Sequence, residues 1–167
     1  NGPVSYKTAK ACFKDMTTPE AVSITSSFAE TMLAAKPAGE KVSCSVLQVD
    51  DDFWKVFQFD FLSGYPFDKA TFDAGATKAV ITEDIARQLF GTTDVVGKTF
   101  LLNHSAYMIC GVVRPVSKLA RYAYAQIWIP LSSTDAFTAS WENYGIMGMV
   151  SVYILAKSQD DFPAIRM

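Results

Sequence analysis

The chain has 167 residues, of which 50% are hydrophobic and 13% aromatic, and its formal net charge is -2 at pH 7. This length fits one domain or two small parts of one chain, and the apolar content excludes a disordered tail or a fibre. Fifteen basic residues against seventeen acidic ones leave no positive excess for phosphate groups, so we expect no nucleic-acid partner.

Hydrophobic periodicity predicts many short strands and a few short helices. In chain order, the expected elements are a helix over 5–16, strands over 21–25 and 42–46, a short helix from 50, strands over 59–62 and 79–81, a helix over 83–90, a hairpin of 99–102 and 106–113, strands over 126–129 and 150–155, and a helix from 160. Residues 28–35 fit either a helix or a strand. Strands dominate without regular alternation with helices, which is typical of an α+β fold with a mixed sheet.

Two helices have features that can be assigned to single residues. The first helix is expected to turn Lys7, Lys10 and Lys14 toward solvent. Thr82 is a typical N-cap, and Gly91 is expected to end the helix of 83–90 with a positive φ angle. Substitution of Gly91 by valine should therefore destabilise the fold by about 1 kcal/mol or more.

No stretch of the sequence meets the requirements of a catalytic, cofactor or metal site. The segment from Gly91 to Thr99 places five residues between its glycines, whereas a phosphate-binding loop has four, and it follows a helix instead of a strand. His104 is the single histidine and lies in a predicted turn, so a zinc or iron centre is not expected. The acidic run 50–52 lacks the spacing of a calcium loop and is better explained as a helix cap.

The three cysteines, Cys12, Cys44 and Cys110, are widely spaced and form no metal-binding pair. Cys44 and Cys110 occupy apolar positions of predicted strands, where we expect them to act as small buried hydrophobic residues. The aromatic run over 53–67 is interpreted chiefly as core.

A partner-binding surface is predicted in the long connection before the last strand. The candidate contact residues are Trp141, Tyr144, Met147 and Met149. Loops rich in Trp, Tyr and Met have the composition of protein interfaces, and loops on a rigid scaffold commonly carry recognition. The competing interpretation is that Trp141 and Tyr144 fold back over an edge of the core.

Six blocks of the sequence, taken in their order and spacing, resemble a known family. They cover residues 49–57, 62–67, 79–91, 95–99, 107–113 and 127–131. Together they are similar to the MacB-like periplasmic core domain of FtsX-type ABC transporter permeases. The motif residues that this resemblance identifies as structural are Phe53, Phe57, Gly64, Leu89, Phe90, Gly91, Gly97 and Gly111. Tyr65 stands where the family often has an arginine.

The resemblance implies a fold of two parts and a non-catalytic role. A porter-like α/β part is expected over 1–49 and 126–167, and a second, smaller lobe over 50–125. Such a domain lies between two transmembrane helices of an inner-membrane permease, faces the periplasm and has no cofactor. A separate ATPase subunit or domain drives the permease, and the outer domain passes the motion to a periplasmic substrate, adaptor or other partner. The alternative function is a stand-alone extracytoplasmic ligand-binding or sensory domain, with the aromatic-lined region as its pocket.

Overall fold

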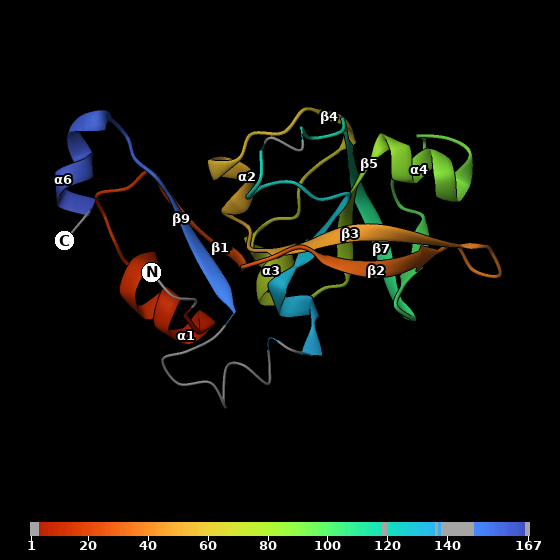
Figure 1. Cartoon of the computed structure of the whole chain (residues 1–167), viewed down its shortest axis with the longest axis horizontal. Helices are drawn as coiled ribbons and strands as arrows, with labels where there is room; N and C mark the ends of the chain where they lie inside the picture. The colour runs from red at the N-terminus through yellow and green to blue at the C-terminus, as the bar shows by residue number, and fades with distance from the viewer. Residues whose placement is uncertain (1–3, 118–119, 136, 138–148, 166–167) are drawn as a thin grey trace.

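The computed structural model describes residues 4–117, 120–135, 137 and 149–165 (Figure 1). Its helices are short: α1 (Tyr6–Ala9), the π-helical η1 (Lys10–Lys14), α2 (Phe53–Val56), α3 (Lys69–Asp73), α4 (Glu83–Phe90), η2 (Leu131–Ser133), η3 (Gln159–Asp161) and α6 (Phe162–Ile165). The strands are β1 (Ala21–Ser26), β2 (Glu30–Ala35), β3 (Lys41–Val49), β4 (Phe61–Gly64), β5 (Lys78–Thr82), β6 (Thr99–Leu102), β7 (Ser105–Val113), β8 (Ile127–Pro130) and β9 (Val150–Leu155). The predicted α+β class with a mixed sheet is confirmed. No described helix is long and apolar enough to cross a membrane.

Six of the strands pair in a closed ring. The order runs β2-β6-β7-β5-β8-β3, and the antiparallel pairing of β2 with β3 returns to the start. The β3–β8 and β5–β7 pairs are parallel and the other four are antiparallel, so the sheet is mixed. In Figure 1, β2 and β3 run across β5 and β7. Because a closed ring satisfies the hydrogen bonds of both edges of each strand, it gives the fold a rigid centre.

The inside of this ring is the first hydrophobic core. Side chains of a strand alternate between its two faces, and in β5 the residues Ala79 and Ile81 point inward while Val80 points outward. Phe100 and Tyr107 close the ring interior with their rings 6.4 Å apart. Helix α4 packs on the same cluster, and its apolar residues are Ile85, Ala86 and Leu89. Both faces of β5 are therefore buried, one inside the ring and one outside it.

The outer face of the ring carries a second core, which is built from aromatic residues. Trp128 on β8 is fully buried, and its ring centroid lies 5.0 Å from that of Phe59. The indole Nε1 of Trp128 donates a hydrogen bond to the carbonyl of Ala123 at 3.2 Å. Phe53 and Phe67 are buried too, so the prediction that the aromatic run is mostly core is confirmed.

A third cluster joins the N-terminal helix to strands β1 and β9, which lie together at one end of the molecule in Figure 1. β9 pairs antiparallel with the whole of β1, whereas the strand pairing of β1 with β3 of the ring is limited to Thr25 opposite Val49. Tyr6 on α1 contacts the rings of Phe72 and Phe137, with centroids 6.2 and 4.8 Å away. The end of the molecule with α1, β1 and β9 is thus attached to the ring by few strand pairs.

The structure differs from the sequence-based expectation in three local features. Helix α3 was not predicted, residues 30–35 form a strand, and the first helix changes from α to π geometry at Lys10. The prediction that Lys14 faces solvent is wrong, because its side chain is only 18% exposed. A π-helical turn contains an extra residue, so positions after it rotate away from the face expected from a 3.6-residue period. The predicted division into 1–49 with 126–167 and 50–125 stays a prediction.

The ends of helix α4 agree with the sequence. Thr82 occupies the N-cap position, although its hydroxyl makes no capping hydrogen bond. Gly91 ends the helix with φ 72° and ψ 6°, the left-handed conformation that was predicted. The β6–β7 hairpin turns through Asn103 and His104, both with positive φ, which is the geometry of a two-residue type I′ turn.

Candidate functional site

The predicted contact residues lie largely outside the described part of the chain. Trp141, Tyr144 and Met147 are not among the described residues, so their role stays a prediction. Met149, the fourth candidate, is described and 72% exposed, directly before β9. At least this end of the candidate surface is open to a partner.

A second large apolar side chain lies beside Met149. Phe28, in the connection between β1 and β2, is also 72% exposed. The backbone N–H of Ser27 donates to the Met149 carbonyl at 2.9 Å, and Ser26 pairs with Val150. Phe28 and Met149 therefore lie at the same end of the β1–β9 ribbon, and we call them the apolar end surface.

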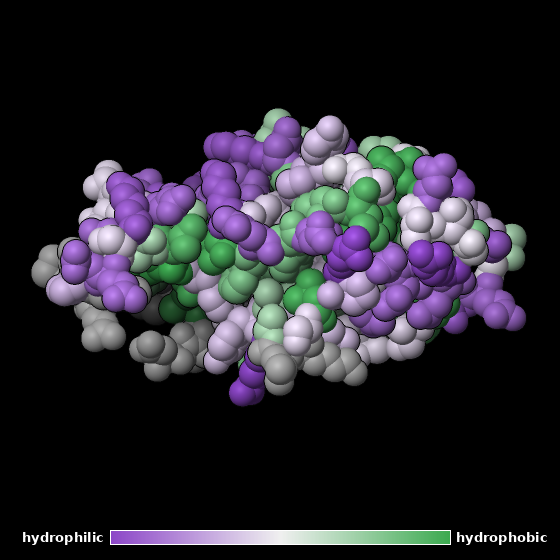
Figure 2. Space-filling model, turned by 90° about the horizontal axis from the view of Figure 1, so that it is seen from above, coloured by the Kyte–Doolittle hydropathy of each residue, from purple (hydrophilic) through white to green (hydrophobic). Residues whose placement is uncertain are grey.

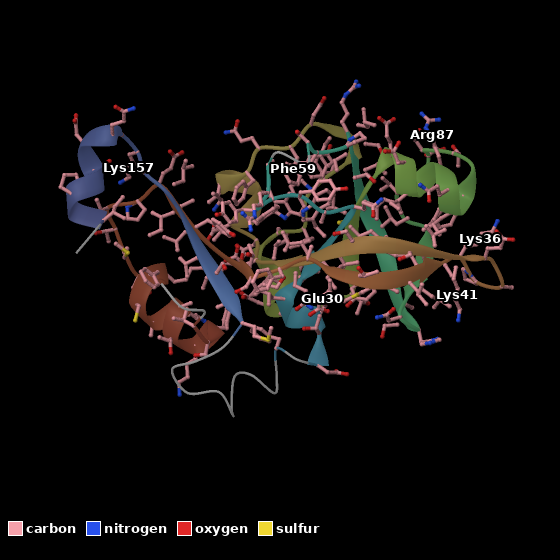
Figure 3. The ribbon with its side chains drawn as sticks, in the orientation of Figure 1. Glu30, Lys36, Lys41, Phe59, Arg87 and Lys157 are labelled. Atoms are coloured by element: carbon pink, nitrogen blue, oxygen red, sulfur yellow. The ribbon has the colours of Figure 1, made fainter. Side chains whose placement is uncertain are left out.

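The sequence analysis did not identify Phe28, because residues 28–35 fitted both helix and strand. Its position near Met149 follows from the pairing of β1 with β9, and pairing between distant strands leaves no local pattern in the sequence. Glu30, labelled in Figure 3, begins β2 close to this surface, whereas Lys36 and Lys41 lie at the opposite end of β2 and β3.

Other exposed apolar residues are spread over the described surface. Tyr65 is 81% exposed, so the position at which the family often has arginine faces water. Tyr122 is 62% exposed and its ring lies 5.8 Å from that of Tyr153. Figure 2 shows several hydrophobic patches among hydrophilic residues on the upper face of the molecule. One of these patches lies toward the end that carries α1 and β9. Single exposed apolar side chains are common, so the pair at the apolar end surface is the stronger candidate.

A cluster of charged side chains lies between the end of the N-terminal helix, β1 and the start of α2. The ammonium of Lys14 lies 2.8 Å from Oδ2 of Asp50 and 2.6 Å from Oδ2 of Asp52, and it donates to the Val22 carbonyl at 2.7 Å. Asp50 is fully buried, while Lys55 reaches Asp52 from the surface at 2.7 Å. We call these groups, Lys14, Asp50 and Asp52, the lysine junction.

Burial and charge compete in the pKa values of the lysine junction. Burial lowers the pKa of Lys14, but the charge and hydrogen bond of Asp50, with those of Asp52, outweigh it and raise the pKa above its usual value. Burial raises the pKa of the Asp50 carboxyl, and Lys14 offsets part of that shift. Burial by itself raises the pKa of Asp52, but hydrogen bonds from Lys14 and Lys55 outweigh burial and hold that pKa below its ordinary value. Lys14 is therefore protonated at neutral pH and bonded to both carboxyl groups.

Two of the motif glycines lie where two chain segments touch. Gly64 at the end of β4 has φ 68°, and a Cβ atom there would overlap the carbonyl of Cys110. Gly111 on β7 faces it, and a Cβ would lie 2.7 Å from the Phe61 ring and 2.9 Å from the Tyr65 carbonyl oxygen. Both glycines thus allow β4 and β7 to approach closely.

The other motif residues occupy core or turn positions. Phe53 and Leu89 are buried, and Phe57 and Phe90 are partly buried against the second and the first core. The remaining two, Gly91 and Gly97, have φ angles of 72° and 86°, with nothing within 4 Å of an added Cβ. The segment from Gly91 follows α4 and enters β6, which is the reverse of the context that a phosphate-binding loop requires.

The described residues contain no group of three or more His, Cys, Asp or Glu side chains that could hold a metal ion. His104 lies exposed in the β6–β7 turn, as predicted. Of the cysteines, Cys44 is buried as predicted, Cys110 is partly buried and Cys12 is exposed. Cys12 lies on η1, two residues before Lys14, and is therefore an accessible thiol at the N-terminal helix.

The buried thiol of Cys44 predicts a loss of stability in alkaline solution. Burial raises the pKa of Cys44 from 9.0 to about 11, so its stabilising contribution is complete below pH 9 and is lost as the pH rises through 11. By pH 11 the free energy of unfolding should have fallen by roughly 2 kcal/mol from this thiol. Urea unfolding at pH 8 and pH 11 measures the change. Cys44→Ala should lose less stability over the same interval, and an equal loss would contradict the prediction.

Comparison with known proteins identifies the family. The family model of the MacB-like periplasmic core domain matches residues 2–167. An uncharacterised ABC transporter permease, YknZ of Bacillus subtilis, is 24% identical over 122 residues, which are 73% of this chain and 29% of that protein. The chain thus spans less than a third of the length of this curated relative.

Three solved structures share the fold. The extracellular domain of the ABC-type transporter YknZ from Gram-positive bacteria has a TM-score of 0.70 and 17% identity, over 96% of this chain and 76% of its own. The periplasmic region of MacB from Actinobacillus actinomycetemcomitans has a TM-score of 0.71 and 12% identity, over 99% and 72%. A domain of a putative permease from Porphyromonas gingivalis has a TM-score of 0.71 and 19% identity, over 95% and 71%. The chain belongs to the family of MacB-like periplasmic core domains of ABC transporter permeases.

Proposed function

We propose that this chain is the non-catalytic, extracytoplasmic domain of an ABC transporter permease of the inner membrane, and that it transmits ATP-driven motion to a periplasmic partner. The observation that carries the proposal is the family match over residues 2–167. The proposed partners are the transmembrane helices of the same permease, a separate ATPase subunit or domain, and a periplasmic adaptor or substrate.

The geometry of the described residues supports a mechanical role. A closed ring of strands resists internal deformation, so a displacement applied at one side reaches the other. The end with α1, β1 and β9 shares one strand pair with the ring, Thr25–Val49, and is otherwise held by side-chain packing and by polar contacts such as those of Asp50. A rigid body with a less tightly joined end is suited to relay motion between a membrane helix and a partner.

The aromatic region gives little support to a ligand-binding function. Most of its rings contact one another edge to face, with the centroids of Phe53 and Phe59 at 5.6 Å and those of Trp54 and Phe59 at 5.5 Å. Such packing fills the space with side chains and is typical of a hydrophobic core. We therefore place partner contact at the apolar end surface, together with the proposed contact residues Trp141, Tyr144 and Met147.

Substitutions at the apolar end surface should separate binding from folding. Phe28→Ser and Met149→Ser remove exposed side chains, so each should change the free energy of unfolding by no more than about 0.5 kcal/mol. Each should weaken the binding of a partner, by over about 1 kcal/mol where the side chain is an anchor of the interface. Urea denaturation measures the free energy of unfolding. Binding is measured by titration with each periplasmic protein that is encoded beside the permease gene.

A matched control comes from the opposite end of the sheet. Lys36→Ser alters an exposed residue in the β2–β3 turn, far from the apolar end surface (Figure 3), and should change neither stability nor binding. Retained partner binding in the Phe28 and Met149 variants, at unchanged affinity, would remove this surface from the proposal.

Transmission of motion can be followed in the complete transporter. The full-length permease and its ATPase are reconstituted in nanodiscs, with Cys12 replaced by serine and Met149 by cysteine carrying an environment-sensitive fluorophore. Addition of ATP with vanadate should shift the emission, and ADP should not. Emission that is the same in both nucleotide states, from a transporter with normal ATPase activity, would contradict the proposed transmission.

A further inference from the structure

The N-terminal helix contains a local departure from regular geometry. α1 is α-helical from Tyr6 to Ala9, and η1 continues it as a π-helix from Lys10 to Lys14. Turns of this kind are rare and are found mostly at functional positions. Here the wide turn rotates Lys14 out of the solvent-facing row that Lys7 begins and directs it toward the start of α2.

Lys14 connects three separate segments of the chain. Its ammonium bonds the Val22 carbonyl on β1 and the carboxylates of Asp50 and Asp52, which lie between β3 and α2. The Lys14 side chain is 18% exposed and that of Asp50 is 1% exposed. One flexible side chain at the edge of the core thus fixes the end of the helix to the body of the domain.

The Asp50 carboxylate of the lysine junction is held by further hydrogen bonds that do not involve Lys14. Oδ1 of Asp50 accepts hydrogen bonds from the Ser23 hydroxyl at 2.9 Å and the Phe53 N–H at 3.1 Å. Oδ2 accepts a hydrogen bond from the Ile24 N–H at 2.8 Å. The buried carboxyl therefore keeps three hydrogen-bond donors when Lys14 moves into water but loses its counter-charge, and this loss favours the closed state.

The other end of the helix has a different kind of attachment. Tyr6 is 5% exposed and packs on Phe72 and Phe137, and Ala9 is fully buried in the same cluster. The Val150 N–H also donates to the Val4 carbonyl at 3.2 Å, so this end is fixed by apolar packing and a backbone hydrogen bond. A helix that is held at its start by packing and at its end by the polar contacts of one lysine can pivot about the former when the latter open.

We infer that the π-helical turn and the lysine junction form a conformational lock on the N-terminal helix. In the closed state, shown here, Lys14 bonds Asp50 and Asp52. In the open state Lys14 enters water, the wide turn relaxes, and the helix pivots about Tyr6 while the ring of strands stays folded. The lock is a property of the isolated chain, and only its use as the entry point of ATP-driven motion rests on the proposed function.

Hydrogen–deuterium exchange of the 167-residue chain, read by mass spectrometry, tests the lock. Lys14→Met should raise the amide exchange of residues 6–16 at least about tenfold, while β5 and β7 inside the ring keep their exchange rates. Asp52→Asn weakens the same junction and leaves the buried Asp50 in place. If Lys14→Met does not fold, the amide exchange of Asp52→Asn tests the lock instead. This variant should raise exchange of residues 6–16 by a smaller factor.

Two lysine substitutions provide matched controls. Lys55→Met removes the surface ion pair of Asp52 without altering the N-terminal helix. Lys7→Met removes an exposed lysine from the N-terminal helix without altering the lysine junction. Neither should change the exchange of residues 6–16. Unchanged exchange in Lys14→Met, an equal rise in β5 and β7, or the same effect from Lys55→Met would each overturn the lock. Because this experiment contains no membrane, ATP or partner, its failure leaves the proposed function standing.

Discussion

Replacement of Gly64 by alanine should destabilise the domain by about 3–5 kcal/mol, enough to unfold a large part of the population. Gly64 has φ 68°, a conformation that costs an L-residue about 1–2 kcal/mol by itself. The added Cβ would also overlap the carbonyl of Cys110, to which the next residue, Tyr65, donates its N–H at 3.0 Å. The backbone must therefore shift, and the pairing of β4 with β7 is lost or distorted.

Gly91→Ala is the matched control for this effect. Gly91 has nearly the same φ of 72°, but nothing lies within 4 Å of a Cβ built there. It should therefore show the conformational cost alone, about 1 kcal/mol. Urea denaturation followed by tryptophan fluorescence gives both values. Equal losses in the two variants would show that the close approach of β4 and β7 does not limit stability.

Truncation of Trp128 to alanine should cost about 3–5 kcal/mol, the usual range for a large buried aromatic residue. Trp128 is fully buried on the outer face of the ring, where its ring contacts those of Trp54 and Phe59. The variant removes these contacts and the hydrogen bond to the Ala123 carbonyl, and it leaves a cavity between β8 and α2.

The measurement is again the free energy of unfolding, followed by circular dichroism because a tryptophan is removed. Tyr65→Ala truncates an aromatic residue that is 81% exposed, and it should change stability by no more than about 0.5 kcal/mol. A loss below 1 kcal/mol in Trp128→Ala would mean that this aromatic cluster is not a core.

Local structure could be predicted well where one residue or one period determines it. The left-handed end of α4 at Gly91 followed from the exclusion of other residue types at that φ, and alternation of apolar residues located β1 and β3. The pairing of β2 with both β3 and β6 could not be predicted in the same way, because pairing between distant strands leaves no local pattern.

The lysine junction was not predicted either, because it also depends on contacts between residues that are distant along the chain. The acidic run 50–52 was interpreted as a helix cap, and Asp50 does accept the Phe53 N–H. Its bond to Lys14, 36 positions away along the chain, depends on the π-helical turn, which the regular helical period does not contain. Of the predicted contact residues, the described part of the chain gives the position of Met149 alone, and Phe28 beside it became visible only through the pairing of β1 with β9.

The central claim, that this domain faces the outside of the inner membrane as part of a permease, is tested most directly by labelling Cys12. This thiol is exposed, whereas Cys44 is buried and Cys110 partly so. In cells that express the full-length permease, with the outer membrane opened and the inner membrane intact, a membrane-impermeant maleimide should label the protein, and Cys12→Ser should lose that labelling. Labelling of Cys12 only after the inner membrane is lysed would contradict the account.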